Sequence, residues 1–589
     1  MISVLSTNIT SPLGFTTEQN YQAVRSGRSA IKRYEPKDGE SQGLWGLPEP
    51  FAASLFSEEQ NAALAISGYT RFEALAIRSV CEALSHIQLD VSSPRVVLIL
   101  STTKGVQSYE SIVHSSESIV QGSSPSEAAL RIAEAVGVTT TPIVVCNACV
   151  SGLSAQLLAS HLLTAGLYDY AIVVGADVQS KFIVSGFQSL KAVSAEPCRP
   201  FDIERNGLNL GEAAATIVYK AAAQAPSPDP SPEEEGSAAA GSLPPRGEVW
   251  RGAVCAACND AFHIVSPSPQ ADGCYRAIET VMAGRDKSKL ATVGVHGTAT
   301  LYNDQMESVA IAKAGLADVP LTALKGYYGH TMGAAGVLET ILTMRATDDG
   351  IVLPSKGFTE LGVSKVVSIS NEPRPTDKTA FLKLMSGFGG CNVAVLYEKA
   401  PLQGIGASPI ISQQLIKSHA VRLSSEDGIS LAEIYKQRIG VYPKFYKMDI
   451  LSRLTFVATE LLSQSLMEGE DSSPLMGGRV GALILFNHSS SIVADRQFLS
   501  TISEDNFFPS PSAFVYTLPN IAAGEVAIRH HICGETSFYI LPEKDEALMQ
   551  QIIEASLRAS GTKRAICGWV DAASETSYEC ELAVYEMLE

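Results

Sequence analysis

The stretch at residues 142–166, PIVVCNACVSGLSAQLLASHLLTAG, decides how the chain folds. Residues 143–146 are a short apolar run rich in β-branched side chains, which is typical of a buried strand. The run breaks at Asn147-Ala148 and gives way to a helical pattern that opens at Ser151-Gly152. The sequence therefore predicts that Cys149 lies on the turn between a strand and a helix.

This position suggests a chemical role for Cys149. The first N–H groups of a helix have no partner within the helix, and the positive end of the helix dipole lies there. Both effects favour a thiolate and offer donors to an oxyanion on a bound carbonyl. A lone cysteine is more often a small buried hydrophobe, so the interpretation of Cys149 as a nucleophile depends on the rest of the chain.

The neighbouring segments indicate a layered fold. Residues 95–100 (RVVLIL) and 170–176 (YAIVVGA) are predicted to be buried strands, and residues 69–87 an amphipathic helix. Strands that alternate with helices are typical of an α/β fold with a largely parallel central sheet. Reactive groups are then expected at the ends of strands.

Composition limits the classes of function. The chain has 589 residues, of which 46% are hydrophobic and 18% charged, so we expect a globular protein of several domains. A net charge of -18 argues against nucleic acid and anionic membranes as partners. The N-terminus lacks the pattern of a signal peptide and no apolar stretch is long enough for a membrane span, so a cytoplasmic location is expected.

Eleven cysteines without regular spacing do not resemble a disulfide framework. Cys255 and Cys258 form one C-x-x-C pair, but no second pair or histidine stands at the spacing of a metal site. No metal is therefore expected.

The chain is predicted to divide into five segments. Residues 221–247 are rich in Pro, Ser, Ala and Glu and are predicted to be a disordered insertion between two halves, 1–220 and 248–404. Periodicity is lost near residue 401, so residues 405–423 are predicted to be a linker to a last module, 424–589.

Four further stretches combine unusual residues. They are residues 199–202 (RPFD) with Gly211-Glu212, residues 295–300 (VHGTAT) followed by Asp304 and Glu307, residues 324–336 (LKGYYGHTMGAAG), and residues 386–392 (SGFGGCN). Singly each pattern is weak, because an isolated histidine is more often a core residue and a glycine turn merely a hairpin. Together, in this order, they are specific.

With these motifs the chain resembles the β-ketoacyl synthases of the thiolase superfamily, in the branch of the elongating condensing enzymes of fatty-acid and polyketide synthesis. The resemblance covers residues 1 to about 400 and includes SPLG near the start and NACVSG around the cysteine. It implies a duplicated βαβαβαββ core of five αβαβα layers, usually in a homodimer, and a Cys-His-His triad.

The resemblance also implies roles for single residues. Cys149 would be the nucleophile, His296 and His330 the catalytic histidines, and Lys325 the lysine of the second histidine motif. Phe388 would gate the site, and its N–H would form an oxyanion hole with that of Cys149. The motif residues expected to support the site are Asp202, Glu212, Asp304, Glu307, Gly389, Gly390 and Asn392.

The chain departs from the family pattern at two places near the pocket. Ala299 and Asn303 replace glycines of the first histidine motif, and residues 384–386 (LMS) replace the usual Asn-Ser-Phe. These changes keep the triad, but they lead us to expect a different substrate shape.

The implied reaction is a decarboxylative condensation. A thiolate takes an acyl group from acyl carrier protein (acyl-ACP), malonyl-ACP loses carbon dioxide, and two neutral imidazoles stabilise the enolate. The product would be a 3-oxoacyl chain for a fatty acid, a polyketide or an aryl polyene-type pigment. No cofactor is expected, because phosphopantetheine arrives on the carrier protein.

Two other functions remain open at this stage. A chain-length-determining partner subunit, with little activity alone, is disfavoured because such partners typically lack the nucleophile. A thiolase or acyltransferase acting on coenzyme A esters is disfavoured by the two histidine motifs, because thiolases pair one histidine with a second cysteine. The active unit is expected to be a homodimer or a heterodimer with a related subunit.

Residues 424–589 are predicted to be a degenerate, non-catalytic copy of the first half. The segment FYKMDILSRLTFVATELLSQS followed by GRVGALILFNHSSS repeats the helix-then-strand order of residues 70–105. Aligning Gly152 with Gly524 places Ile521 at the position of Cys149, and an isoleucine cannot attack a thioester. Half a core leaves an apolar face uncovered, so we expect the module to pack against the synthase, its dimer mate or another subunit.

Overall fold

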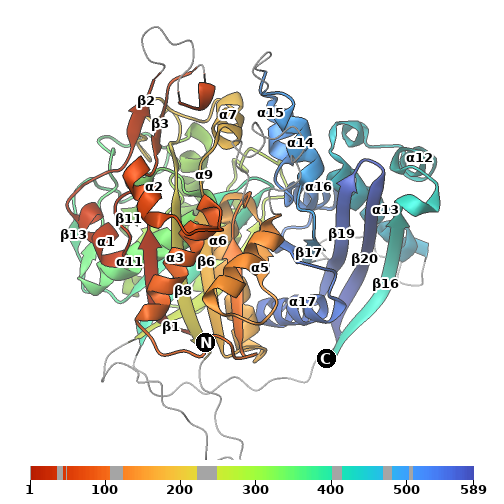
Figure 1. Cartoon of the computed structure of the whole chain (residues 1–589), viewed down its shortest axis with the longest axis horizontal. Coiled ribbons are helices and arrows are strands. Elements are labelled where there is room, and N and C mark those ends of the chain that lie inside the picture. The colour runs from red at the N-terminus through yellow and green to blue at the C-terminus, as the bar shows by residue number, and fades with distance from the viewer. Residues whose placement is uncertain are drawn as a thin grey trace, which may run out of the picture.

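The computed structural model describes residues 2–35, 44–47, 49–105, 124–221, 249–400, 414–468, 481–502 and 508–588. Of the predicted insertion at 221–247, all but Ala221 lies outside the described residues. Fifteen of the strands form one continuous sheet. Helices cover both faces of this sheet (Figure 1). Among the described residues no helix is long and apolar enough to cross a membrane.

Five strands of the first half form the sheet that carries Cys149. Their spatial order is β1 (Ile2–Thr10), β8 (Ala213–Ala221), β6 (Tyr170–Asp177), β4 (Val96–Ser101) and β5 (Ile143–Val145). Strand β4 runs parallel to both β5 and β6, and β8 runs antiparallel to β6 and β1. The turn after β5 is therefore at the edge of this sheet.

The second half repeats this order. Its strands are β9 (Val249–Asn259), β15 (Cys391–Ala400), β14 (Ala380–Gly387), β10 (Leu290–Gly294) and β11 (Leu321–Thr322). If the five strands of each half are numbered along the chain, their spatial order across the sheet is first, fifth, fourth, second and third. The two halves meet where β1 pairs with β9 at Ile2 and Gly252.

Helices separate and cover the two sheets. Helices α6 (Ser151–Thr164) and α11 (Ala335–Asp348) contact strands of both halves and lie between them. Both are apolar or small on nearly every face, as expected of a helix buried all round. On the outer faces lie α3 (Arg71–Ser85) and α5 (Pro125–Val136), and on the other side α8 (Asp272–Met282) with α9 (Leu301–Lys313). The five layers predicted from the sequence are confirmed.

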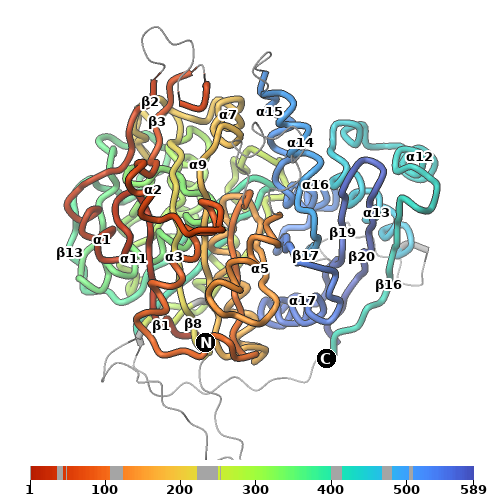
Figure 2. Tube along the Cα trace, viewed as in Figure 1, coloured from red at the N-terminus to blue at the C-terminus, as the bar shows by residue number. Residues whose placement is uncertain are grey.

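The C-terminal residues form a third sheet with the same strand order. Its strands are β16 (Gln414–Ser424), β20 (Ser577–Leu588), β19 (Arg564–Ser574), β17 (Ala482–Asn487) and β18 (Thr536–Ile540). Strand β18 continues the first sheet, because it runs antiparallel to β5 with Tyr539 opposite Val145 and Ile540 opposite Val144. The blue end of the chain thus gathers on one side of the molecule (Figure 2).

The contact between the first sheet and this module is symmetric. Strands β5 and β18 hold the same place in their sheets. Helix α6 follows β5 and packs against α17 (Glu546–Ser560), which follows β18. Antiparallel pairing of equivalent elements is the pattern that a twofold axis produces in a dimer. The module therefore sits on the first half as a second copy of that half would sit.

Further helices and strands lie between these elements along the chain. They are α1 (Thr17–Arg25), β2 (Lys32–Tyr34), β3 (Phe51–Ser54), α2 (Glu58–Leu64), α7 (Lys181–Ser189), β7 (Leu210–Gly211), α10 (Lys325–Tyr328), β12 (Ile351–Val352), β13 (Arg374–Pro375), α12 (Leu431–Ile434), α13 (Ile450–Glu468), α14 (Ile492–Leu499), α15 (Pro511–Tyr516) and α16 (Ile521–His530).

The predicted linker at 405–423 is wrong for its second part. Residues 414–423 belong to β16, the outermost strand of the module, and residues 401–413 lie outside the described part. Strand β16 mixes polar and apolar side chains, with Lys417 and Arg422 exposed and only Leu423 buried. Charged edge strands of this kind prevent pairing with other chains, and their polarity made this one resemble a linker.

The predicted alignment of Ile521 with Cys149 is also wrong. Ile521 begins α16, which precedes β18 and so takes the place of α5 rather than α6. Cys149 follows the end of β5 by four residues, and Lys544 follows the end of β18 by the same number. Lys544, which also lacks a thiol, therefore occupies the counterpart position.

Candidate active site

Cys149 lies on a tightly held turn between β5 and α6. Ala148 adopts a left-handed backbone conformation with a φ of 47°, which turns the chain sharply just before the cysteine. The Ser151 hydroxyl accepts from the N–H of Asn147 at 2.8 Å and donates to the Ala148 carbonyl at 2.6 Å. On the module side, the N–H of Phe538 donates to the Asn147 side chain at 2.8 Å. The module thus helps to fix the turn.

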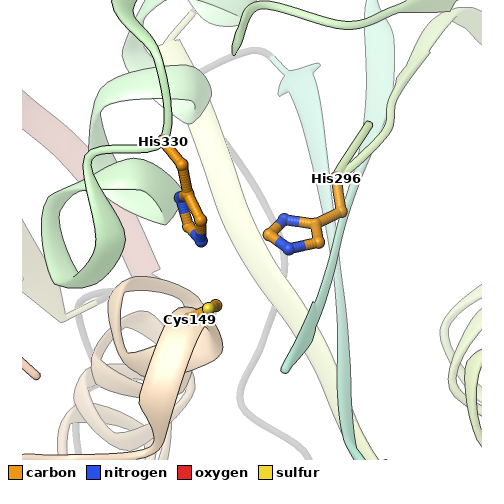
Figure 3. Close-up of side chains that lie close together, drawn as sticks. All are labelled: Cys149, His296 and His330. Carbon is orange, nitrogen blue, oxygen red and sulfur yellow. The ribbon is translucent and has the colours of Figure 1, made fainter. Parts of the chain in front are cut away.

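The structure brings Cys149, His296 and His330 together. The cysteine Sγ and one nitrogen of each ring all lie within 4.8 Å of one another. The two ring centroids are 5.2 Å apart and the ring planes are nearly perpendicular, at 81°. Both imidazoles point toward the thiol from different elements of the second half (Figure 3). Three residues from widely separated motifs therefore form one buried cluster.

A backbone hydrogen bond sets the tautomer of His330. The N–H of Met332 donates to Nδ1 at 3.2 Å, so Nδ1 must hold the lone pair and the ring proton belongs on Nε2. Among the described residues this Nε2 has no hydrogen-bond partner, although it is buried. His330 therefore presents an unused N–H donor to the space beside Cys149.

His296 is held through its backbone. Its N–H donates to Glu307 at 2.6 Å, and its carbonyl accepts from the Lys325 ammonium at 2.6 Å. The ring Nδ1 lies 3.3 Å from the Met385 sulfur, so one of the replaced motif residues contacts the imidazole directly.

Both histidines are neutral at pH 7. Burial lowers the pKa of His296 and of His330 well below the usual 6.5, and the Lys325 ammonium lowers both pKa values further.

The hydrogen bonds of the Lys325 ammonium go to groups beside the reactive cluster. Besides the His296 carbonyl, it binds Glu339 at 2.8 Å and is fully buried. These contacts support a positioning role, and a direct catalytic role for Lys325 stays a prediction.

The predicted thiolate form of Cys149 is contradicted. Burial raises the pKa of the thiol to about 12, and the nearby Asp177 carboxylate raises it further, while Lys325 and a backbone hydrogen bond lower it. Desolvation is the largest of these effects. The protonated thiol is therefore the resting form at neutral pH.

The glycine turn at residues 387–390 lies against the backbone of Cys149. A Cβ atom on Gly387 would come within 3.3 Å of the Cys149 nitrogen. Gly389 and Gly390 both have positive φ angles, 88° and 76°, which a glycine adopts without strain. The Phe388 ring is half-buried and stacks on Phe187 with centroids 6.3 Å apart. The oxyanion hole built from this turn stays a prediction.

The predicted supporting side chains mostly accept hydrogen bonds from the backbone around the site. Glu307 accepts from the N–H of His296 and of Gly297, and Asp304 from that of Phe201. Asp202 accepts from the N–H of Thr359 and of Glu360. Glu212 accepts from the N–H of Phe56 and of Gln179, and Asn392 donates to the Gly390 carbonyl.

A narrow apolar pocket opens beside Cys149, and part of its wall was not predicted from the sequence. The lining residues are Thr103, Lys104, Ala148, Cys149, Ile183, Phe187, Met332, Phe388, Phe514 and Leu518. Phe514 and Leu518 belong to the C-terminal module. No motif marks Phe514 in α15 or Leu518 in the turn after it, because an aromatic or aliphatic side chain there looks like any core residue.

A buried ion pair fastens the module beside this pocket. The Lys104 ammonium lies 2.6 Å from Asp495 and also donates to the Thr517 carbonyl. Both side chains are almost fully buried. The ion pair joins the loop after β4 to helix α14 of the module.

Comparison with known families identifies the chain. The family model of the β-ketoacyl synthase N-terminal domain matches residues 1–225, and that of the β-ketoacyl synthase C-terminal domain matches residues 252–359. Together they cover more than half of the chain. The chain belongs to the β-ketoacyl synthase family. This establishes the fold and family predicted from the motifs.

Curated relatives carry related names. A 3-oxoacyl-[acyl-carrier-protein] synthase 2 of Mycobacterium leprae is 30% identical over 269 residues, which are 44% of this chain and 60% of that protein. The synthase 2 of Vibrio cholerae is 26% identical over 431 residues, covering 68% of this chain and 99% of that protein. The match to the Mycobacterium leprae relative thus spans about 60% of that relative's length.

Two solved structures show the extent of the fold. A β-ketoacyl synthase from Burkholderia phymatum covers 68% of this chain and 99% of its own, with 22% identity and a TM-score of 0.55. A structure titled PfaC keto synthase-chain length factor covers 99% of this chain and 78% of its own, with 13% identity and a TM-score of 0.73. The similarity in fold to the second structure therefore extends over the C-terminal module.

Proposed function

We propose that this β-ketoacyl synthase is a 3-oxoacyl-[acyl-carrier-protein] synthase that joins a cysteine-bound acyl chain to malonyl-ACP with loss of carbon dioxide. The observation that carries the proposal is the cluster of one thiol and two neutral imidazoles within 4.8 Å. A nucleophile next to two uncharged N–H donors suits a reaction in which negative charge develops on thioester oxygens.

The first step loads the acyl chain. The Cys149 sulfur attacks the acyl thioester of the carrier, the carrier sulfur leaves, and the thiol proton of Cys149 goes to that sulfur. One thioester replaces another and no net charge is created, which suits a thiol whose pKa is about 12. The apolar pocket beside Cys149 receives the alkyl chain.

The second step forms the carbon–carbon bond. Malonyl-ACP loses its carboxylate as carbon dioxide, and the electron pair of the broken bond forms an enolate. The fixed Nε2–H of His330 donates to the enolate oxygen, with His296 beside it. The enolate carbon attacks the acyl carbonyl, Cys149 leaves as a thiolate, and this thiolate takes up one proton.

The carrier protein and its phosphopantetheine arm are part of this proposal, and the protein then needs no cofactor of its own. The product is a fatty-acid or polyketide intermediate, and the reaction takes place in the cytoplasm. Support for a carrier partner comes from the names of the relatives, which are acyl-carrier-protein synthases. Neither nucleic acid nor a membrane is needed as a partner.

The C-terminal module takes the place of a partner subunit in this proposal. Its strand order repeats that of the first half, and β18 pairs with β5 as an equivalent strand of a second copy would. It carries Lys544 where the first half carries Cys149, so it has no thiol at that position to hold an acyl group as a thioester. It also supplies Phe514 and Leu518 to the pocket. We therefore assign it a chain-length role within the same polypeptide, as a degenerate half-synthase.

Mass spectrometry of the intact protein tests the loading step. Incubation with acyl-ACP should add one acyl group, which should be absent in Cys149→Ala and present in the matched control Cys146→Ala. His296→Ala and His330→Ala should still be acylated, while carbon dioxide release from malonyl-ACP falls about 100-fold or more, as expected on loss of an oxyanion donor. An adduct that survives Cys149→Ala would overturn the proposal.

A further inference from the structure

A second buried lysine lies behind the two histidines. Lys383 is in the middle of β14 and is 1% exposed. Its ammonium donates to the carbonyls of Gly294 and Val295 at 3.1 and 2.8 Å, and to that of Leu384 at 3.1 Å. The first two carbonyls belong to the end of β10 and the residue after it. Lys383 therefore holds the segment that leads directly into His296.

Glu339 connects this lysine to Lys325. The Glu339 carboxylate lies 2.7 Å from the Lys383 ammonium through Oε2 and 2.8 Å from the Lys325 ammonium through Oε1. All three side chains are buried. Two ammonium groups share one carboxylate, so the three groups carry one uncompensated positive charge.

The strand register directs Lys383 toward the histidine site. Side chains alternate along β14, so Lys383 shares its face with Met385, whose sulfur contacts the His296 ring. A Cβ atom on Gly294 would come within 3.0 Å of the Lys383 side chain. The missing side chain at Gly294 thus leaves room for the lysine stem beside the histidine segment.

A purely structural role does not account for a charged residue here. Removing an ammonium from water is costly unless its partners compensate, and burial accordingly lowers the pKa of Lys383. A neutral apolar side chain would fill the same space without this desolvation penalty, but the carbonyls of Gly294, Val295 and Leu384 would lose their donor. The feature that a lysine adds is its charge, at a place where a carboxylate is already paired with Lys325.

We infer that Lys383 is a positioning residue of the synthase, which keeps His296 and His330 in their neutral forms by leaving one positive charge uncompensated behind them. The inference rests on the proposed function only for its reaction readout. The neutral form matters most for His330, because a proton on Nδ1 would face the Met332 N–H and break the hydrogen bond that orients the ring.

Several other ionisable groups lie around the two histidines. They are Cys149 on the turn before α6, Asp177 at the end of β6, Asp304 and Glu307 on α9, Lys325 on α10 and Glu339 on α11. Burial holds the pKa of Asp304 near 6 and that of Glu307 near 7. Only the two lysines are cations in this set. Replacing Lys383 by a neutral residue therefore makes the surroundings of the two histidines less positive.

The test is Lys383→Met, which keeps the length of the side chain and removes the charge. Histidine titration by NMR in the full chain, with signals assigned from His296→Ala and His330→Ala, should show the pKa of at least His330 rising. Because activity is lost as His330 takes up a proton, the acid limb of malonyl-ACP decarboxylation should move to higher pH by about one unit, the lower end of the effect of a nearby charge.

A second variant separates charge from structure. Lys383→Met combined with Glu339→Gln removes one charge of each sign, leaving the net charge of the cluster at +1, so the acid limb should return toward that of the parent. A structural role predicts that the double variant is at least as impaired as the single one at every pH. Lys378→Met, an exposed lysine just before the same strand, is the matched control and should leave the profile unchanged.

Two outcomes would overturn the inference. One is a folded Lys383→Met protein whose histidine titration matches the parent. The other is a double variant whose acid limb stays displaced. If the parent shows no decarboxylation at all, the proposed function fails, but the NMR titration still decides whether Lys383 sets the protonation of the histidines.

Discussion

The side chain of Asn520, in the C-terminal module, donates to the main-chain carbonyl of Phe388 at 2.8 Å. One turn further along, a Cβ atom on Gly524 would come within 2.8 Å of Gly389, so the start of α16 lies directly on the glycine turn. The same turn touches the backbone of Cys149 through Gly387. The module is therefore connected to the nucleophile through one short loop.

Replacing Asn520 by alanine should loosen this turn. The Phe388 carbonyl would lose a buried partner, which costs about 1–3 kcal/mol. We expect faster alkylation of Cys149 by iodoacetamide if Phe388 gates the site as predicted, and slower acyl transfer because the turn is less ordered. Gln497→Ala, at an exposed position of α14, is the control. Equal alkylation rates in both variants would show that the module does not hold the gate.

A second prediction concerns the length of the acyl chain. Phe514 is buried in the pocket wall, and its ring fills the space beside Gly186, where a Cβ atom would lie 2.2 Å away. Phe514→Leu should shift the preference of the acyl-transfer step toward longer acyl-ACP substrates, measured by mass spectrometry with a panel of chain lengths. Phe508→Leu, at a side chain that is 72% exposed, should change nothing. An unaltered preference in Phe514→Leu would place the limit of the pocket elsewhere.

The sequence predicted those parts of the structure that a local pattern encodes. The Cys149 turn and the His296 segment follow from apolar runs that end at a polar or glycine residue, and the His330 segment follows from a glycine-rich turn. The structure brings the three residues together. The pKa of Cys149 could not be predicted in this way. The position at the helix end is local, whereas the burial that dominates comes from elements far along the chain.

Contacts between segments far apart in the chain could not be predicted from the sequence alone either. Lys383 looks like an ordinary strand residue until Glu339 is placed opposite it. The alignment of Gly152 with Gly524 failed because one shared glycine is weak evidence of register. The order of the five strands, which only the structure reveals, assigns the counterpart of Cys149 correctly.

The ion pair between Lys104 and Asp495 should couple the module to the synthase energetically. Asp495→Asn leaves a buried ammonium without its carboxylate, which should lower the free energy of unfolding by about 3–5 kcal/mol. Lys104→Met combined with Asp495→Leu removes both charges and should recover most of this loss. Urea denaturation of Lys104→Met, Asp495→Leu and the double variant measures the coupling. Additive losses would mean that the pair contributes nothing to docking.

His161 should make the contact between the synthase and its module sensitive to acid. It lies on α6 with Nδ1 3.3 Å from the Ser556 hydroxyl of α17, and burial lowers its pKa to about 4. The unfolded chain binds a proton at His161 below pH 6.5, whereas the folded chain does so only near pH 4. The stability from this depressed pKa is therefore complete above pH 6.5 and lost as the pH falls. Between pH 7.5 and pH 5 the loss is about 2 kcal/mol.

His161→Leu should lack this part of the acid destabilisation in urea denaturation at the two pH values, while the contributions of His296 and His330 remain. A variant that loses as much stability as the parent over this range would show that His161 is not the group responsible.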